Sequence, residues 1–581
     1  MIAALAPEVT IDSNILSKVS IDEKVKLLGK VVSIESGGLC SWSIVDSDIN
    51  LNERLLTPST LTFSASSAVT ECNFALMGNT LAERTTYQFK LSCSTGSVAS
   101  SVFSLVTNGP PLPGVLNINP SSGTELDTFF LISANLWGDE DLPITYMFGF
   151  TDPSTSLEQV LTNRNEVSYT RTQLPAGKLD DASGEELLSC NVQVFDSLSS
   201  STTLKQKVEV KILEISAEAL TDKLDGAFGA AGSSADTKNA LALFTSFSNR
   251  VDCSAAPTDC AVLNREKCST TTNTCGPCLA NFLGASGNSN SECLSGTSAS
   301  RRRLVAAALS KTCPASCSGN GVCRFSNVYL KSIVSTCTID DANCIAFCDC
   351  NLNYDGEACS LTMSELASKR NNRNTLIAQF VSLVQKEDAT KDLIVSQVAS
   401  LSSLVTQRDE ISQNGASEVM GLANSIIQSS NEINVLTSGL PKVLSSIDLA
   451  ISILGRVFAH QPDEVRRRTT VDKEKLFSAQ ITSLEAFSDI ALTGMVLGEG
   501  IRSYLHNNFR VVAMVHTRSA STNTHIEQQV PLTATELFYG RSANQSLELM
   551  VPPPKFTQSS KSDIRVSLSS FTTLTLGFLN P

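Results

Sequence analysis

The sequence contains few of the residues from which catalytic and metal sites are built. Its 581 residues include two Trp, seven Tyr and only four His. The His side chains stand singly, with no near Cys or Asp in a recognised pattern, at His460, His506, His516 and His525. No G-x-S-x-G elbow, H-E-x-x-H signature or Walker loop occurs, and Gly498-Glu499-Gly500 lacks the third glycine of a dinucleotide site. We therefore expect a protein that is not an enzyme and that has no cofactor.

Long apolar runs are also missing. No segment reaches the roughly 18 apolar residues that suggest a membrane-spanning helix. The first residues, Met1–Pro7, lack the basic and apolar parts of a secretion signal. The sequence alone predicts no membrane-spanning segment. Because its cysteines indicate an oxidising compartment while no secretion signal is visible, we expect a fragment whose signal peptide and any anchor lie outside it.

Positive charge is scarce relative to negative charge. The chain has 58 acidic and 44 basic residues, giving a net charge of −14. Such a chain repels a phosphate backbone, so we expect no nucleic-acid partner. The two dense basic runs, Arg301–Arg303 and Arg466–Arg468, are interpreted as solvated loop charge or as processing sites.

Cysteine is abundant and decides the compartment. Fourteen of the 18 cysteines fall between Cys253 and Cys359, in a stretch poor in large apolar residues. Such a stretch depends on disulfides to fold, which places the protein outside the cytosol. Zinc is the weaker alternative, because only one C-x-x-C occurs and every His lies far downstream. That tetrapeptide, Cys275-Gly276-Pro277-Cys278, also occurs in thioredoxins, but here it lies among other cysteines with no βαβ pattern, so we interpret it as structural.

The chain before the cysteine block is rich in short alternating strands. Residues 1–107 and 108–212 each predict a β sandwich, because apolar and polar residues alternate between Ser, Thr and Gly turns. A proline-rich break at Asn108–Gly114 separates the two. Trp42 and Trp137 are expected in their cores. Residues 213–250 change to a helical period and predict two short helices around a Gly/Ser hinge.

Three segments in this region resemble the REJ (receptor for egg jelly) module of the polycystin family. They are Asn108-Gly109-Pro110-Pro111, the segment Asn119–Phe130 with its P-x-x-G-x-x-L-x-T-x-F order, and Trp137–Phe148 with its W-x-D-x-D-x-P-x-x-Y-x-F order. The resemblance covers about residues 1–250. It implies tandem fibronectin-III/Ig-like sandwiches and a short helical tail on the outside of a cell.

The cysteine block divides into a Cys-rich module at 251–300 and a second module at 301–360. The six cysteines of the first allow fifteen pairings, and their spacing does not choose among them: Cys253, Cys260, Cys268, Cys275, Cys278 and Cys293. The second resembles an EGF-like module, through its Cys-x-Cys and the Asn353–Gly356 turn before the last Cys. This resemblance implies Cys313–Cys323, Cys317–Cys348 and Cys350–Cys359, with Cys337 and Cys344 paired in an enlarged loop. The calcium-binding variety has acidic residues where Ser310–Thr312 stands, so the resemblance does not support calcium here.

The remaining chain predicts a helical bundle followed by strands. Apolar residues at helical spacing favour three or four antiparallel helices over residues 361–470, and a β-rich domain follows over 471–581. The order of these parts resembles the GAIN region of polycystins and adhesion receptors. The His-Leu-Ser/Thr cleavage sequence of that family does not occur, so we assign no self-cleavage.

Two further candidates remain open at this point. Asp139-Glu140-Asp141, with Asp127 upstream, can be read as solvated turn residues or as oxygen ligands for Ca²⁺. Asn544-Gln545-Ser546 is an N-glycosylation sequence.

Together these observations indicate a multi-domain, mainly β protein with a helical bundle and a C-terminal α+β or β-sandwich domain. We expect an extracellular adhesion or recognition ectodomain that binds other proteins or glycans through its sandwich surfaces, with homotypic assembly possible. The alternative is a structural subunit of an extracellular filament or coat, such as a flagellar hair (mastigoneme).

Overall fold

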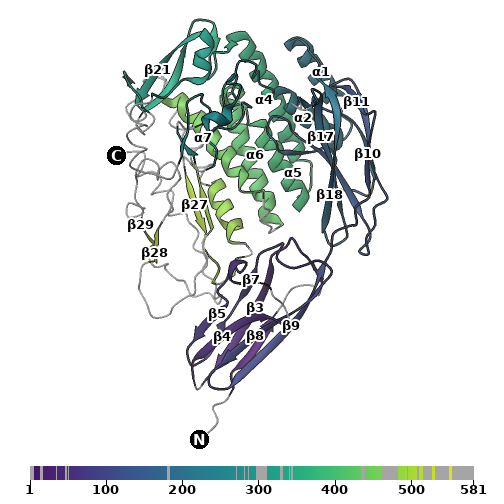
Figure 1. Cartoon of the computed structure of the whole chain (residues 1–581), viewed down its shortest axis with the longest axis vertical. Coiled ribbons are helices and arrows are strands. Elements are labelled where there is room, and N and C mark those ends of the chain that lie inside the picture. The colour runs from purple at the N-terminus through teal and green to yellow at the C-terminus, as the bar shows by residue number, and fades with distance from the viewer. Residues whose placement is uncertain are drawn as a thin grey trace.

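The computed structural model describes a single elongated molecule with a β sandwich at one end (Figure 1). The described residues are 6–12, 18–34, 36–45, 49, 51–179, 183–269, 271–280, 282–284, 287–295, 310–327, 332–338, 341, 344–433, 439–459, 482–493, 495–496, 498–500, 502–506, 509–513, 526–529 and 548–551.

The first sandwich forms because apolar side chains alternate along its strands. Its strands are β1 (Glu8–Asp12), β2 (Lys18–Ser20), β3 (Val25–Ser33), β4 (Gly38–Ile44), β5 (Thr60–Phe63), β6 (Ser66–Glu71), β7 (Phe74–Leu76), β8 (Thr86–Ser94) and β9 (Val98–Asn108). One sheet has the order β1-β3-β6 with β7 added beside β3, and the other has the order β2-β9-β8-β4-β5. Trp42 is buried between them, and its Nε1 donates to the carbonyl oxygen of Cys72 at 2.8 Å. Phe74 and Phe89 fill the same core.

The second sandwich repeats this design and adds a helical side. Its strands are β10 (Val115–Asn119), β11 (Ser122–Thr124), β12 (Phe129–Asn135), β13 (Thr145–Thr151), β14 (Glu158–Val160), β15 (Tyr169–Gln173), β16 (Lys178–Leu179), β17 (Glu186–Phe195) and β18 (Ser201–Lys211). Sheet β10-β12-β15 faces sheet β11-β18-β17-β13-β14, with β16 beside β17. Trp137 is half-buried against this core.

Seven helical segments pack around one apolar core beside the second sandwich. They are α1 (Ala217–Ala230), α2 (Ser234–Ser248), α4 (Met363–Val384), α5 (Lys391–Leu404), α6 (Gln413–Glu432), α7 (Lys442–Ala459) and residues 482–492. Helix α4 begins at a capping box, in which Thr362 and Glu365 satisfy each other's free backbone N–H groups. Residues of α1 and α2 share one apolar core with α4 to α7, so the tail of the second sandwich and the bundle form a continuous unit.

Short β elements complete the described chain. They are β19 (Phe282–Leu283), β20 (Leu294–Ser295), β21 (Gly321–Asn327), β22 (Ile333–Val334), β23 (Cys344–Cys350), β24 (Tyr354–Asp355), β25 (Leu361–Thr362), β26 (Arg502–Leu505), β27 (Arg510–Ala513), β28 (Ile526–Gln529) and β29 (Glu548–Val551). The β26–β27 hairpin adds Phe509, Val511 and Ala513 to the helical core. The sheet around β21 lies at the far end of the molecule from the first sandwich (Figure 1).

A buried ion pair fastens the helices together. Arg373 of α4 is fully buried and binds Glu410 through Nε at 3.2 Å and Nη2 at 2.5 Å. Its Nη1 donates to Oδ1 of Asn249 at 2.9 Å, and Nη2 donates to the carbonyl oxygen of Ser248 at 3.3 Å. Burial alone would raise the pKa of Glu410, but the charges of Arg373 and Lys369 and their hydrogen bonds outweigh it and hold the pKa below its usual value.

Replacing Arg373 with Met leaves the Glu410 carboxylate buried beside Lys369 alone. We expect a loss of about 3–5 kcal/mol in the free energy of unfolding, measured by urea denaturation at pH 7. The double variant R373M/E410L removes both charges and is expected to recover most of that loss. The exposed Lys386, changed to Met, is the matched control, with an effect within about 0.5 kcal/mol. An R373M loss no larger than the control's would contradict the role of the pair.

The Arg373–Glu410 pair also makes the free energy of unfolding depend on pH. The lowered pKa of Glu410 means that its contribution is fully present above the unfolded value of 4.5 and is lost as the pH falls below it. In R373M only Lys369 still opposes the effect of burial, so the pKa of Glu410 is higher than in wild type and acidification costs the variant less stability than it costs wild type. The stability deficit of R373M relative to wild type should therefore shrink on acidification from pH 7 to pH 4, and a deficit that grows would refute this assignment.

Candidate functional site

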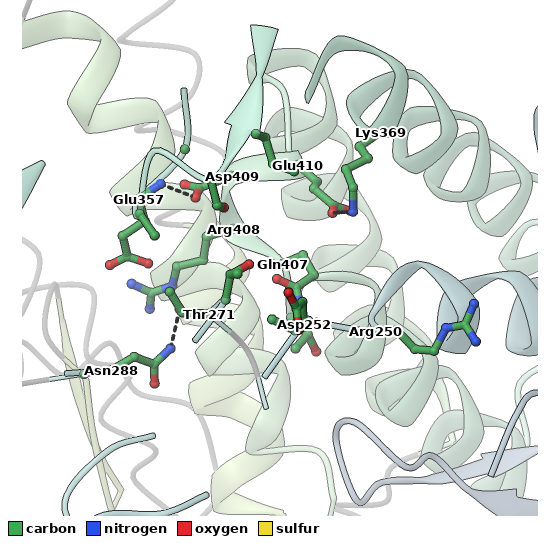
Figure 2. A pocket seen from close by; sticks show the side chains of 18 of the residues that line it. Arg250, Asp252, Thr271, Asn288, Glu357, Lys369, Gln407, Arg408, Asp409 and Glu410 are labelled. Carbon is green, nitrogen blue, oxygen red and sulfur yellow. Dashed lines mark hydrogen bonds and ion pairs between the residues drawn. The ribbon is translucent and has the colours of Figure 1, made fainter. Parts of the chain in front are cut away.

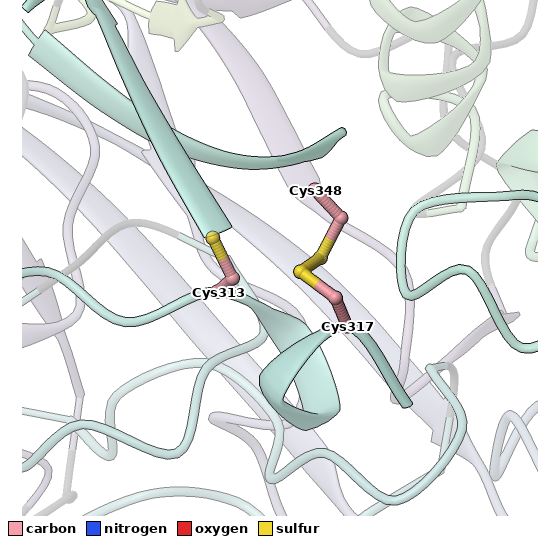
Figure 3. A group of neighbouring side chains, drawn as sticks. All are labelled: Cys313, Cys317 and Cys348. Carbon is pink, nitrogen blue, oxygen red and sulfur yellow. A yellow bond between two sulfur atoms is a disulfide. The ribbon is translucent and has the colours of Figure 1, made fainter. Parts of the chain in front are cut away.

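The EGF-like cysteines form four disulfides in the structure. They join Cys313 to Cys323, Cys317 to Cys348, Cys337 to Cys344 and Cys350 to Cys359, the partners implied by the resemblance. The sulfur atoms of Cys313, Cys317 and Cys348 lie within 4.8 Å of one another (Figure 3). Because all three are in disulfides, none offers a thiolate to a metal ion.

The preceding Cys-rich module has a regular pairing that spacing alone left open. Its disulfides are Cys253–Cys268, Cys260–Cys275 and Cys278–Cys293, and each spans 15 residues. Cys275 and Cys278 of the C-G-P-C sequence therefore bind different partners instead of each other. This places the tetrapeptide in a structural framework.

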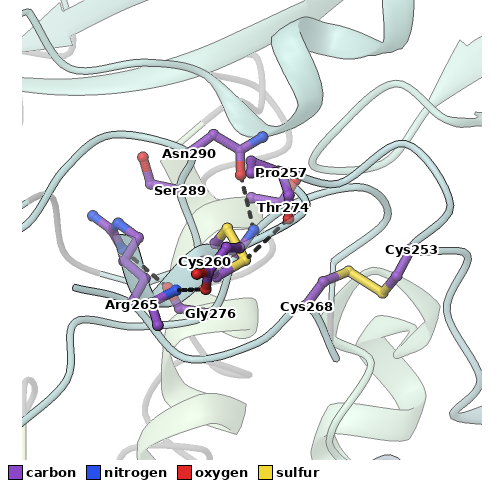
Figure 4. The surroundings of a disulfide bond; sticks show 12 residues. Cys253, Pro257, Cys260, Arg265, Cys268, Thr274, Gly276, Ser289 and Asn290 are labelled. Carbon is purple, nitrogen blue, oxygen red and sulfur yellow. Dashed lines mark hydrogen bonds between the residues drawn. A yellow bond between two sulfur atoms is a disulfide. The ribbon is translucent and has the colours of Figure 1, made fainter. Parts of the chain in front are cut away.

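An arginine takes the place of an apolar core in this module. Arg265 is 1% exposed and donates to the backbone carbonyl oxygens of Gly276, Gly287 and Ser291. Figure 4 shows Arg265 beside Gly276 and the disulfide-bonded Cys260. Burial lowers the pKa of its guanidinium to about 10, so it remains charged at neutral pH. Gly287 is in a left-handed turn at φ 76° and borders the cavity described next. Arg265 thus fixes one wall of that cavity.

A cavity of 530 Å³ lies where the Cys-rich module, the EGF-like module and the helices meet (Figure 2). Most charges at its wall are committed within the chain: Lys369 pairs with Glu410 at 3.0 Å, and Asp409 accepts the backbone N–H of Glu357 at 2.6 Å. The guanidinium of Arg408 lines the cavity without a hydrogen bond or ion pair to the described residues. The cavity is lined mainly by polar groups of both charges, which suits a small polar ligand better than an apolar one.

The acidic turn forms a cluster at the junction of the two sandwiches. Carboxylate oxygens of Asp139, Asp141 and Asp196 lie within 4.8 Å of one another, whereas Asp127 is elsewhere and pairs with Lys223 at 3.0 Å. The grouping with Asp127 was therefore wrong, and Asp196 takes its place because β17 ends beside this turn.

The charges of this cluster are already balanced by protein groups. Asp141 pairs with Lys18, Asp139 lies 3.9 Å from Arg84, and Asn108 donates to Asp196. Burial raises the pKa of Asp196 above its usual value, although hydrogen bonds from Asn108 and from backbone N–H groups oppose the rise. Because Lys18 and Asn108 belong to the first sandwich, the cluster acts as a polar fastening between the sandwiches.

Three of the remaining sequence candidates lie outside the described residues. They are Asn544, Arg301–Arg303 and Arg466–Arg468.

Sequence reasoning missed the disulfide Cys40–Cys93, which joins directly opposite residues of β4 and β8. Their place at inward positions of alternating strands was the available signal. Within the part of the chain that the structure describes, no helix is long and apolar enough to span a bilayer.

Comparison with known families identifies the two sandwiches and the two short helices directly after them. Residues 4–246 match the REJ domain. This REJ region includes both sandwiches, α1 and most of α2. No curated protein matches the chain.

Several solved structures of β-sandwich proteins align with part of the chain. Murine CEACAM1b shares 13% identity over 36% of this chain and 100% of its own, with a TM-score of 0.16. A bacterial ice-binding adhesin shares 10% over 36% of this chain and 66% of its own, with a TM-score of 0.22. The Ig1-2 module of the Drosophila receptor tyrosine phosphatase DLAR shares 8% over 36% and 100%, with a TM-score of 0.14.

Two thiols are expected to resist alkylation in the folded chain. Cys72 and Cys190 are buried without a disulfide, and burial raises their pKa values to about 11 and about 12. Iodoacetamide at pH 8 should leave both unmodified until the chain is unfolded, because the thiolate is the reactive form. Peptide mass spectrometry without reduction checks this together with the eight disulfides. Labelling of any of the fourteen cysteines from Cys253 to Cys359 before reduction would contradict the pairing.

Replacing Arg265 with Lys should loosen the Cys-rich module. One ammonium group cannot reach three separated carbonyl oxygens, so we expect a local loss of about 2 kcal/mol. Hydrogen exchange of residues 253–293 measures it. Arg324→Lys is the matched control, because Arg324 is exposed and, among the residues that the structure describes, forms an ion pair with Asp349 alone. Equal exchange in the two variants would show that Arg265 does not hold the module together.

Proposed function

We propose that this chain is a non-enzymatic recognition ectodomain of a polycystin-like cell-surface protein. The observation that carries the proposal is the REJ region, an extracellular type of module, followed directly by seven disulfides between Cys253 and Cys359. We include in the proposal an EGF-like identity for residues 301–360 and a GAIN-like identity for the helices and strands after residue 361. The disulfides Cys313–Cys323, Cys317–Cys348 and Cys350–Cys359 support the EGF-like identity, and the order of helices before a hairpin supports the GAIN-like identity.

Recognition in this proposal depends on surface complementarity. Each sandwich keeps one outward sheet face exposed, and the polar cluster at Asp139, Asp141 and Asp196 fastens the sandwiches to each other. Contacts also connect the first sandwich with the rest of the molecule: Lys391 at the start of α5 pairs with Glu23 at 3.4 Å, and Lys24 pairs with Glu499, in the turn before β26, at 2.5 Å. A fixed arrangement favours binding, because little conformational entropy is lost when a partner docks.

Surface labelling of intact cells tests the proposal. An antibody against the first sandwich should label cells of the source organism before permeabilisation, and the purified chain should bind those cells in a manner lost after disulfide reduction. Labelling that needs permeabilisation would overturn the extracellular assignment. Antibody decoration at regular intervals along an appendage in electron micrographs would favour the filament subunit over the receptor.

A further inference from the structure

The outer face of sheet β10-β12-β15 combines amide, aromatic and aliphatic side chains. Its strands are antiparallel, and Leu131 in the middle strand lies directly between Asn119 and Arg171. The next outward row is Asn117, Ser133 and Tyr169. We call the outward residues of these strands the amide face: Val115, Asn117, Asn119, Phe129, Leu131, Ser133, Asn135, Tyr169, Arg171 and Gln173.

Large apolar side chains on this face are exposed to solvent. Phe129 is 52% exposed, Leu131 42% and Tyr169 59%. Val167, just before β15, and Leu136, just after β12, extend the apolar surface at one end. Aromatic residues and arginine are the types enriched where proteins contact one another, and clustered exposed apolar groups mark such contacts.

Charge distinguishes this face from the chain as a whole. The chain has a net charge of −14, yet no outward residue of the three strands is acidic, and Arg171 is the single charged residue. Two copies of an acidic molecule repel each other least where neither presents a carboxylate. The guanidinium of Arg171 lies 5.0 Å from the ring centre of Phe129, so it is held by its own chain before any partner arrives.

The polar residues of the face are self-complementary. The side chains of Asn117, Asn119, Asn135 and Ser133 can each donate and accept hydrogen bonds. Asn135 donates to Ser133 within the face at 3.5 Å, and Gln173 already donates to the carbonyl oxygen of Leu126 at 2.7 Å, which leaves its amide oxygen as an acceptor. A row of amides can therefore pair with an identical row about a two-fold axis, whereas a row of like charges cannot. Composition, charge and hydrogen-bonding capacity thus favour a second copy of this chain as the occupant.

We propose that the amide face is a homotypic contact through which two copies of this chain pack about a two-fold axis. This deepens the proposed function and rests on it, since the contact would join ectodomains outside the cell. Ten residues a side is fewer than the roughly 20–30 of a standard interface, so we expect a weak and transient dimer. Screening of the net negative charge by added salt strengthens it.

Sedimentation velocity of the whole chain between about 1 and 200 µM tests the contact. Wild type should show a concentration-dependent dimer that becomes tighter in high salt. Leu131→Glu and Arg171→Glu, which add carboxylates to the face, should each weaken the dimer at least tenfold. Val102→Glu is the matched control, because Val102 is 53% exposed on the outward face of β9 in the first sandwich. Thermal unfolding should show that all three variants remain folded.

A disulfide trap tests the two-fold geometry separately. Ser133 is near the middle of the face, so Ser133→Cys should form a covalent dimer under mild oxidation, and Ser100→Cys on β9 should not. A wild-type chain that stays monomeric at 200 µM in high salt, or equal effects of Val102→Glu and Leu131→Glu, would overturn the proposal. If the chain is monomeric but Leu131→Glu abolishes its binding to cells, the face binds a different protein: the homotypic contact fails while the proposed function survives.

Discussion

The buried pair of Arg373 and Glu410 is the interaction on which the arrangement of the modules depends. Extracellular modules are often joined by linkers that few contacts cross, and relative motion of domains is then the default. Here the guanidinium of Arg373 joins α4 to the end of α2, through Ser248 and Asn249, and to the segment after α5. Asn249 in turn donates to Ser403, whose hydroxyl group donates to Asp152 of the second sandwich at 3.2 Å. Because one partner cannot leave without stranding a buried charge, the REJ region is locked to the helices that follow it.

The two small cysteine-rich modules are stabilised in a different way. Between Cys253 and Cys359 the chain is too poor in apolar mass to bury a core, and its compactness comes from seven covalent loops and a buried arginine. Backbone carbonyls satisfy Arg265, so its charge orders three loops at once. These modules and the helices together line the cavity. Lys369 and Glu410, which form an ion pair beside Arg373, also lie at its wall. The disulfide-bonded modules therefore contact the helices close to the Arg373–Glu410 pair.

Local patterns in the sequence predicted those parts of the fold that depend on neighbours along the chain. Alternation predicted sandwiches, because one buried face imposes a period of two, and helical spacing predicted α1, α2 and α4 to α7. The EGF-like spacing implied partners that the structure also shows for Cys313 to Cys359. Contacts between distant segments left no such signal. The union of α1 and α2 with the bundle, the entry of Asp196 into the Asp139 cluster and the cavity near Arg408 each require a three-dimensional arrangement, which spacing does not encode. Cys40 and Cys93 were visible as inward positions, yet their pairing needed the register of β4 and β8.

Rigidity also determines what a small recognition surface can achieve. A face of about ten residues supplies little net affinity, since part of its interaction energy offsets the freedom lost on association. That loss is smaller when the surface is held in a fixed direction by the rest of the molecule. The second sandwich contacts α2 and α5 through β14 of its larger sheet, and α2 also contacts β15 at the edge of the other sheet, whose outward face stays exposed in a set orientation. The junction through Asn108 and Asp196 adds the first sandwich to the same frame. Weak contacts on such a frame gain strength when several copies are arrayed on one surface, because each further contact forms at high effective concentration.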